Sequence, residues 1–262
     1  MKAVIELLKK DRESFVSPEK DWLRSQRGVL ICSECELFKA DYPDPVDVRL
    51  SQIPDGTSYS GVFHVGIGVI HEQLFEELRA NLAGVVTGRV HWKDGSLLRE
   101  YRTIYCGTRV LLRGAADARY YVCGTCGRNL GASSTERPYF IAATLPAMNV
   151  HQDAICCMYL HAEVAERLNW AAYPDLEPHP VEVLEEPLPD DPLPGIERAV
   201  RQLTAAFEGD RAAAFRAVGE EAASLSVAAN AHLIHIEVRG VPLAVRGYVR
   251  GGVFRVEQFS TG

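Results

Sequence analysis

The sequence contains no apolar run long enough to cross a membrane, and its N-terminus lacks the long hydrophobic core and small-residue cleavage site of a signal peptide. We therefore expect a cytoplasmic protein that does not bind membranes. The seven cysteines are an odd number, as is typical of a reducing compartment. There a Cys-x2-Cys pair more often binds a metal or does redox work than forms a structural disulfide.

The common catalytic motifs are also missing. The sequence has no His-Glu-x-x-His helix, no Gly-x-Ser-x-Gly elbow and no phosphate loop. Gly66-Ile-Gly68 lacks the third glycine of a dinucleotide-binding loop and is interpreted as part of a core strand. No catalytic pair can be named, so we do not expect an enzyme. An enzyme whose site is assembled from dispersed residues remains an alternative hypothesis.

The chain has no basic surplus, because 28 lysines and arginines face 35 acidic residues and the net charge is −7. Residues 174–195 contain seven of the acids and no lysine or arginine, so the rest of the chain is balanced at 28 against 28. Such a chain is a poor candidate for nonspecific binding to a phosphate backbone, and we do not expect a nucleic-acid partner. A basic protein suits the acidic segment better.

Two Cys-x2-Cys pairs are the strongest local signal. They consist of Cys32, Cys35, Cys123 and Cys126. Four thiolates at such spacing predict a closed, tetrahedral Zn²⁺ site that stabilises the fold and leaves no open position for chemistry. Gly127 follows the second pair and permits the tight turn of a knuckle, whereas Glu36 takes the same place after the first pair.

Alternatives to the zinc site remain open. Residues 36–122 separate the two pairs, whereas a compact ribbon needs only about one or two dozen residues. The cysteines could instead pack as small apolar side chains without metal. A redox role for the second pair would require a helix that begins at Cys123, and residues 127–131 are a poor helix start.

Hydrophobic periodicity predicts an α+β fold. We expect a mostly antiparallel sheet domain with zinc-ribbon-like double Cys-x2-Cys knuckles over residues 1–186, a linker rich in proline and acid over 187–195, and a small helix and β-meander unit over 196–262. The expected helices cover residues 3–15, a segment after Ser17-Pro18, 71–82, 161–168, 196–207 and 210–229. The expected strands cover 28–32, 46–50, 62–70, 85–92, 99–105, 109–113, 119–123, 139–144, 154–160, 232–239, 241–250 and 253–259. Residues 174–195 are interpreted as a stiff, polyproline-like connector that contains a last short strand at 181–184.

The chain resembles the double-CXXCG family of bacterial proteins, best known from myxobacteria, some of which are immunity proteins against contact-delivered swarming-inhibition toxins. The similarity covers residues 25–186 and rests on Cys32-Ser-Glu-Cys35, on Cys123-Gly-Thr-Cys126-Gly127, and on a tail in which 162–168 is followed by 178–184. Glu36 in place of glycine departs from the family pattern, and residues 195–262 lie outside the resemblance. The resemblance implies a cytoplasmic, non-enzymatic protein that neutralises a cognate toxin, with the four cysteines as structural zinc ligands.

Two binding hypotheses follow. In the first, the protein is an immunity factor that meets a basic toxin through its acidic segment and its C-terminal unit. The predicted contact residues are Glu185, Glu186, Asp190 and Asp191. In the second, it is a zinc-ribbon nucleic-acid-binding or transcription accessory module, which requires a basic face near the knuckles. The candidates for that face are Arg109, Arg113, Arg119 and Arg128.

Overall fold

The structure is a computed structural model that describes residues 4–10, 16–33, 45–62, 66–82, 85–106, 109–120, 123, 125, 135–145, 150–153, 157–224, 233–250 and 253–261. Contacts divide the chain into two units, which consist of Met1–Leu112 with Tyr139–Glu186 and of Arg113–Pro138 with Pro187–Gly262. Residues 113–138 therefore group with the C-terminal part of the chain, although the sequence analysis places them in the first domain. The predicted α+β class is confirmed, and most strand pairs are antiparallel.

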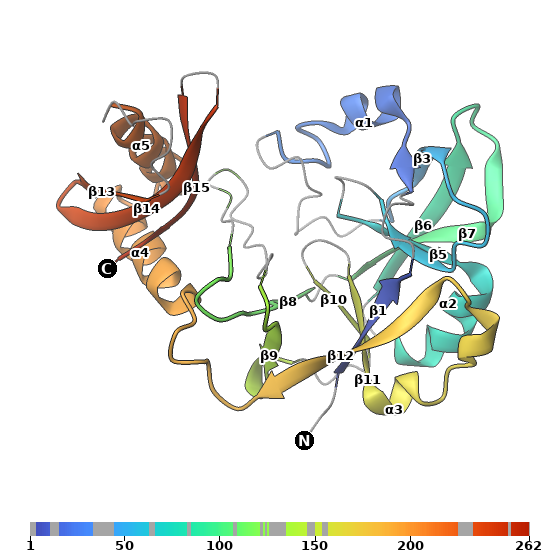
Figure 1. The fold of residues 1–262 in the computed structure, drawn as a ribbon. Coiled ribbons are helices and arrows are strands. Elements are labelled where there is room, and N and C mark those ends of the chain that lie inside the picture. Colours follow the sequence, from blue (N-terminus) through green and yellow to red (C-terminus); the bar gives the residue numbers. More distant parts are fainter. Residues whose placement is uncertain are drawn as a thin grey trace. The chain divides into compact units, whose positions relative to one another are not determined.

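The first unit contains two six-stranded sheets. In spatial order, the strands of the first sheet are β8 (Arg109–Val110), β10 (Val150–Asp153), β11 (Met158–His161), β1 (Val4–Lys9), β12 (Leu176–Leu184) and β9 (Tyr139–Ile141). Those of the second sheet are β2 (Ser17–Pro18), β3 (Val48–Gln52), β6 (Val85–Trp92), β7 (Leu97–Cys106), β5 (Gly68–His71) and β4 (Tyr59–Gly61). Figure 1 shows β1 between β11 and β12.

The helix predicted over residues 3–15 is wrong for Val4–Lys9, which form the interior strand β1. This strand pairs antiparallel with β11 on one side and with β12 on the other. Ile5 and Leu7 pack in one hydrophobic cluster while Val4 packs in another. Because both faces of β1 contact apolar side chains, the strand shows no polar alternation, and its apolar spacing also fits a helix.

The connector predicted over residues 174–195 is wrong for residues 176–180, because β12 spans Leu176–Leu184 and pairs with β1 from Leu176 to Val181. The short strand predicted at 181–184 is confirmed as the end of β12. Pro178 and Pro180 lie within this strand. They are two residues apart, so both missing N–H groups belong to the same side of the strand. The other neighbour, β9, pairs only with Glu182–Leu184. A strand can therefore tolerate both prolines where it has a single partner among the described strands.

The strand predicted over residues 28–32 is a turn that follows helix α1 (Lys20–Gln26). Gly28 has φ +78° and donates its N–H to the Ile31 carbonyl at 2.7 Å. A glycine with positive φ just past the last helical turn is a common way to end a helix. Ile31 and Cys32 are nevertheless buried, whereas Val29 is exposed, so only the end of the apolar run belongs to the core.

Besides α1, the described part of the first unit contains five short helical segments. They are α2 (Glu72–Leu78), η1 (Arg79–Asn81), η2 (Ala142–Thr144), α3 (Ala162–Ala165) and η3 (Trp170–Ala172). One hydrophobic cluster joins Leu160 of the first sheet and Ile104 of the second with Leu74 of α2 and Val164 of α3. The predicted succession of a strand and a helix before residue 82 is confirmed in β5 and α2.

The second unit packs two helices against a three-stranded sheet (Figure 1). Its elements are α4 (Leu193–Ala206), α5 (Arg211–Ser224), β13 (Leu233–Val238), β14 (Val241–Arg250) and β15 (Val253–Ser260). Ile236 and Val238 are buried with the helices, while His235 and Glu237 are exposed. The alternation that predicted this meander is therefore confirmed. No helix in the described part of the chain is long and apolar enough to span a membrane.

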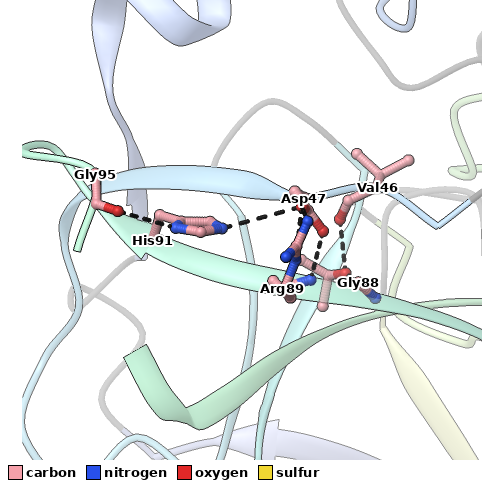
Figure 2. Close-up of polar contacts among 7 residues, drawn as sticks. Val46, Asp47, Gly88, Arg89, His91 and Gly95 are labelled. Carbon is pink, nitrogen blue, oxygen red and sulfur yellow. Dashed lines mark hydrogen bonds and ion pairs between the residues drawn. The ribbon is translucent and has the colours of Figure 1, made fainter. Parts of the chain in front are cut away.

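The backbone at Val46 lies so close to Gly88 of β6 that a side chain at position 88 would clash with it. The Gly88 N–H donates to the Thr103 hydroxyl at 2.7 Å, and that hydroxyl donates to the Val46 carbonyl at 2.8 Å. A Cβ atom at Gly88 would lie 2.3 Å from the Val46 oxygen, which is backbone and cannot rotate away. Figure 2 shows Val46 and Gly88 side by side.

We predict opposite effects for two glycine-to-alanine changes. Gly88→Ala should lower the free energy of unfolding of the first unit by about 2 kcal/mol or more, because the backbone must move to relieve the clash. Gly219→Ala, in α5, should raise stability by about 0.5–1 kcal/mol, because its Cβ would meet nothing within 4 Å and alanine favours helix. Urea unfolding followed by circular dichroism measures both, and a neutral Gly88→Ala would contradict the close approach.

Candidate functional site

The structure describes two of the four predicted zinc ligands. Cys32 is 1% exposed and belongs to the first unit, while Cys123 is 0% exposed and belongs to the second. Cys35 and Cys126 lie outside the described residues. Among the residues that the structure does describe, no group of three or more His, Cys, Asp or Glu side chains is placed to hold a metal. Since half of the predicted ligand set is outside that part, the zinc site remains a prediction.

The acids of residues 174–195 separate into two groups. Asp175 accepts hydrogen bonds from the backbone N–H of Ser58 at 2.8 Å and from the Ser58 hydroxyl. Asp191 is buried, and its side chain is 0% exposed. By contrast, Glu182, Glu185, Glu186 and Asp190 are exposed, and Glu177 is half-buried. Asp191 is therefore wrongly included among the predicted partner contacts, because no partner can reach a carboxylate that the fold already covers.

Asp191 is the centre of a polar network inside the second unit. Its Oδ2 accepts a hydrogen bond from Nε of Arg113 at 2.7 Å. Its Oδ1 accepts from the Leu193 N–H at 2.8 Å and from the Tyr120 hydroxyl at 3.2 Å. The Tyr120 oxygen in turn accepts the Gly114 N–H at 2.9 Å. The network thus joins the segment around Arg113 to the start of α4.

Burial keeps Tyr120 in its neutral, hydrogen-bond-donating form. Removal from water raises the pKa of Tyr120 well above its usual range, and the negative charge of Asp191 raises it further. The phenol therefore remains a donor to Asp191. The Arg113 side chain is only 12% exposed, so the ion pair is largely shielded from solvent. A buried pair of this kind costs much more to break than a surface pair does.

The same network removes one residue from the basic face that a nucleic-acid-binding module requires. Arg113 is committed to Asp191, and Arg119 is exposed. The side chain of Arg109 and all of Arg128 lie outside the described part of the chain. No observation therefore favours the nucleic-acid hypothesis.

A shallow hollow of about 410 Å³ lies on the second sheet of the first unit, where the pairing of β6 and β7 changes register. Arg89 pairs with Arg102, and the next residue pair along the ladder is His91 with Leu97. The four residues 98–101 of β7 therefore lie opposite the single residue 90 of β6. Irregularities of this kind interrupt the ladder and redirect side chains, and they are frequent beside functional sites.

Three arginines line the hollow. They are Arg89, Arg99 and Arg102, and Glu72, Thr87 and Tyr101 lie beside them. Burial raises the pKa of Tyr101, and the Glu100 carboxylate raises it further, so the phenol adds no negative charge at neutral pH.

Carboxylates hold two of these arginines. Glu72, the first residue of α2, accepts from Arg102 Nε at 2.7 Å and also from Nη2. The Arg102 guanidinium carbon lies 3.9 Å from the centroid of the Phe75 ring. Asp47 accepts from the Arg89 backbone N–H at 2.8 Å and from its Nε at 3.0 Å, and Nη2 is 2.8 Å from the same carboxylate.

Asp47 also lies next to His91 (Figure 2). The His91 Nε2 is 3.9 Å from Asp47 Oδ2, and its Nδ1 is 3.1 Å from the Gly95 carbonyl oxygen. Because a carbonyl can only accept, Nδ1 carries the hydrogen in this contact. The ring therefore lies between Asp47 and the turn that joins β6 to β7.

Sequence reasoning missed the hollow. The predicted strands at 85–92 and 99–105 are confirmed in β6 and β7, but their register shift depends on pairing between strands. One signal was present in the sequence. Two apolar residues, Leu97 and Leu98, are followed by two charged residues, Arg99 and Glu100. This order breaks the alternation of apolar and polar residues in a regular half-buried strand and indicates a bulge.

In comparisons with known proteins, no protein-family model and no curated protein matches this chain.

We predict that Asp191→Asn lowers the free energy of unfolding of the second unit by about 3–5 kcal/mol, because it removes the buried carboxylate charge that pairs with Arg113. Asp190→Asn is the matched control. Its side chain is exposed and should change stability by no more than about 0.5 kcal/mol. Urea unfolding of both variants is the measurement, and equal midpoints would contradict the buried ion pair.

Proposed function

We propose that the protein is a non-enzymatic binding protein that neutralises a basic protein partner in the cytoplasm, as the resemblance to toxin-neutralising immunity proteins implies. The observation that supports this proposal is a group of exposed acids at the end of β12 and just after it. Glu182 lies in β12, and Glu185 and Glu186 follow it directly. All three side chains are exposed, and no basic side chain among the described residues pairs with Glu185 or Glu186.

The place of these acids in the fold suits recognition. The strand β12 that precedes Glu185 pairs with β1 and, at its end, with β9. Strand pairing thus fixes the backbone that carries Glu182 and leads directly into Glu185 before a partner arrives, which reduces the entropy lost on binding. A cluster of one charge sign also accelerates encounter with a partner of opposite sign, and salt weakens that effect.

The partner can be identified by capture of the tagged full-length chain from its native host at low salt, with mass spectrometry of the eluate. We expect one stoichiometric basic protein that is toxic when expressed alone and harmless when co-expressed with this chain. Bound nucleic acid without such a protein would contradict the proposal.

We predict that the double change Glu185→Lys and Glu186→Lys weakens this complex by about tenfold or more, because it places like charges at the interface. The dependence of affinity on salt should also become less steep, since fewer favourable charge contacts remain. Isothermal titration calorimetry at two salt concentrations measures both effects.

The matched control is Glu163→Lys with Glu166→Lys, two exposed acids at α3 in the first unit, outside the acidic segment and the C-terminal unit, which makes the same change in net charge. It should leave the affinity within about twofold of the parent, because surface charges away from an interface act only through the screened overall field. Equal weakening by both double variants would contradict a localised acidic contact.

We also propose that Cys32, Cys35, Cys123 and Cys126 bind one structural Zn²⁺ ion. The burial of Cys32 and Cys123 supports a closed site, in which the thiolates are shielded from water. Bound zinc would contribute folding free energy and no catalytic chemistry. The alternative role of small apolar packing predicts the same burial but no metal.

The zinc proposal predicts one zinc ion per chain by inductively coupled plasma mass spectrometry. Cys126→Ser should lose that zinc and unfold at lower temperature, because a serine hydroxyl does not replace a thiolate ligand. Cys157→Ser is the control, since Cys157 belongs to neither Cys-x2-Cys pair, and it should retain the metal. A zinc-free parent protein purified without chelator would contradict the site.

A further inference from the structure

We propose that the hollow at the register shift of β6 and β7 binds the oxyanion of a small acid, a carboxylate or phosphate group held by Arg89, Arg99 and Arg102. This inference is independent of the proposed function, which concerns the acidic segment and a basic protein partner. It rests on the geometry of the second sheet alone.

The first step is the direct pairing of two like charges. Arg89 and Arg102 are partners in an antiparallel ladder. The Cβ atoms of such partners are about 4.5–5.5 Å apart, and like charges at that separation destabilise the sheet. A protein that keeps both arginines must compensate their charges, and Asp47 and Glu72 do so here.

The second step is the direction in which the two carboxylates lie. Asp47 immediately precedes β3, the neighbour of β6, while Glu72 immediately follows β5, the neighbour of β7. Since β6 and β7 lie between β3 and β5, the two arginine side chains are held toward opposite sides of their shared ladder. The space between them belongs to the hollow, and the hollow is lined by both side chains.

The third step is the count of remaining donors. A guanidinium group has five N–H donors. The contacts of both Arg89 and Arg102 with their carboxylates use Nε and Nη2, and Nη1 has no acceptor among the described residues. The carboxylate contacts at Nε and Nη2 thus fix the orientation of each guanidinium group. Its other N–H donors remain for a ligand. Charge-assisted bonds from arginine forks are well suited to planar carboxylates and to phosphates.

Arg99 supplies the charge that no carboxylate balances. Its side chain is exposed, and within the described ranges no acid forms an ion pair with it. Glu72 also lines the hollow, but Arg102 compensates its charge. An oxyanion in the hollow would therefore meet one uncompensated arginine and the spare donors of two compensated ones.

The size and polarity of the hollow define the class of ligand. Its volume of about 410 Å³ is within the range of about 300–1,000 Å³ for small-molecule sites and far exceeds the roughly 30 Å³ share of one water. The hollow is open, and its lining includes three arginines, so a purely apolar ligand would leave their donors without partners. A small organic acid or a phosphorylated small molecule fits both properties.

The test uses the full-length chain labelled with ¹⁵N at arginine, titrated at constant ionic strength with inorganic phosphate and, separately, with citrate. We expect saturable shifts of the Nε signals of the three hollow arginines with at least one probe. Tighter binding of phosphate would identify a phosphate-bearing ligand, and tighter binding of citrate a carboxylate. Arg99→Gln should weaken the binding about tenfold, because it removes one charged donor group.

Two variants complete the design. Arg49→Gln removes an exposed arginine of β3 outside the hollow and should leave binding unchanged. Arg99→Lys should recover part of the affinity, because lysine keeps the charge but lacks the fork. Unchanged thermal midpoints show that the variants are folded. Absence of saturable binding with both probes, or equal weakening by Arg99→Gln and Arg49→Gln, would overturn the proposal.

Discussion

The pairing of β1 with both β11 and β12 is the constraint on which the first unit depends. Val4–Lys9 lie near one end of the chain, and their partners follow more than 150 residues later, at Met158–His161 and Leu176–Val181. Contacts between residues so distant in sequence gain free energy only after a large loop has closed. The first sheet is therefore complete only when β12 is present, and residues 113–138 leave the first unit between β8 and β9. A single domain boundary in the sequence cannot describe these two units, because each unit consists of two separate segments of the chain.

The sequence predicted best those elements whose partners are close in the chain. Val241–Arg250 forms β14 with the expected bounds, and a strand before α2 is also expected from the sequence. In these segments alternation, helical spacing and glycine placement act locally. The errors at residues 3–15, 28–32 and 174–195 have the opposite cause. Each segment is apolar or proline-rich, and its conformation depends on what it packs against elsewhere in the fold.

The candidate sites were predictable only in part, because a sequence counts charges without showing which of them are buried. Residues 174–195 were correctly identified as acidic, but Asp175 and Asp191 serve the fold through Ser58 and Arg113. The arginine hollow could not be derived at all from charge, since Arg89 and Arg102 become neighbours only through the register of β6 and β7. The break of alternation at Leu97-Leu98 indicates that a bulge is present but not which side chains the bulge brings together.

A net charge of −7 does not argue against an anion in the arginine hollow. At physiological ionic strength, charges at the surface are screened over about 8 Å, so distant acids act weakly on a ligand already in contact with guanidinium groups. Net charge governs encounter, and a negative net charge favours a basic partner, whereas hydrogen-bond geometry would govern retention of an anion in the hollow. Two of the three arginines there are already neutralised. Selectivity in the hollow would therefore depend on the fixed orientation of the forks more than on an excess of positive charge.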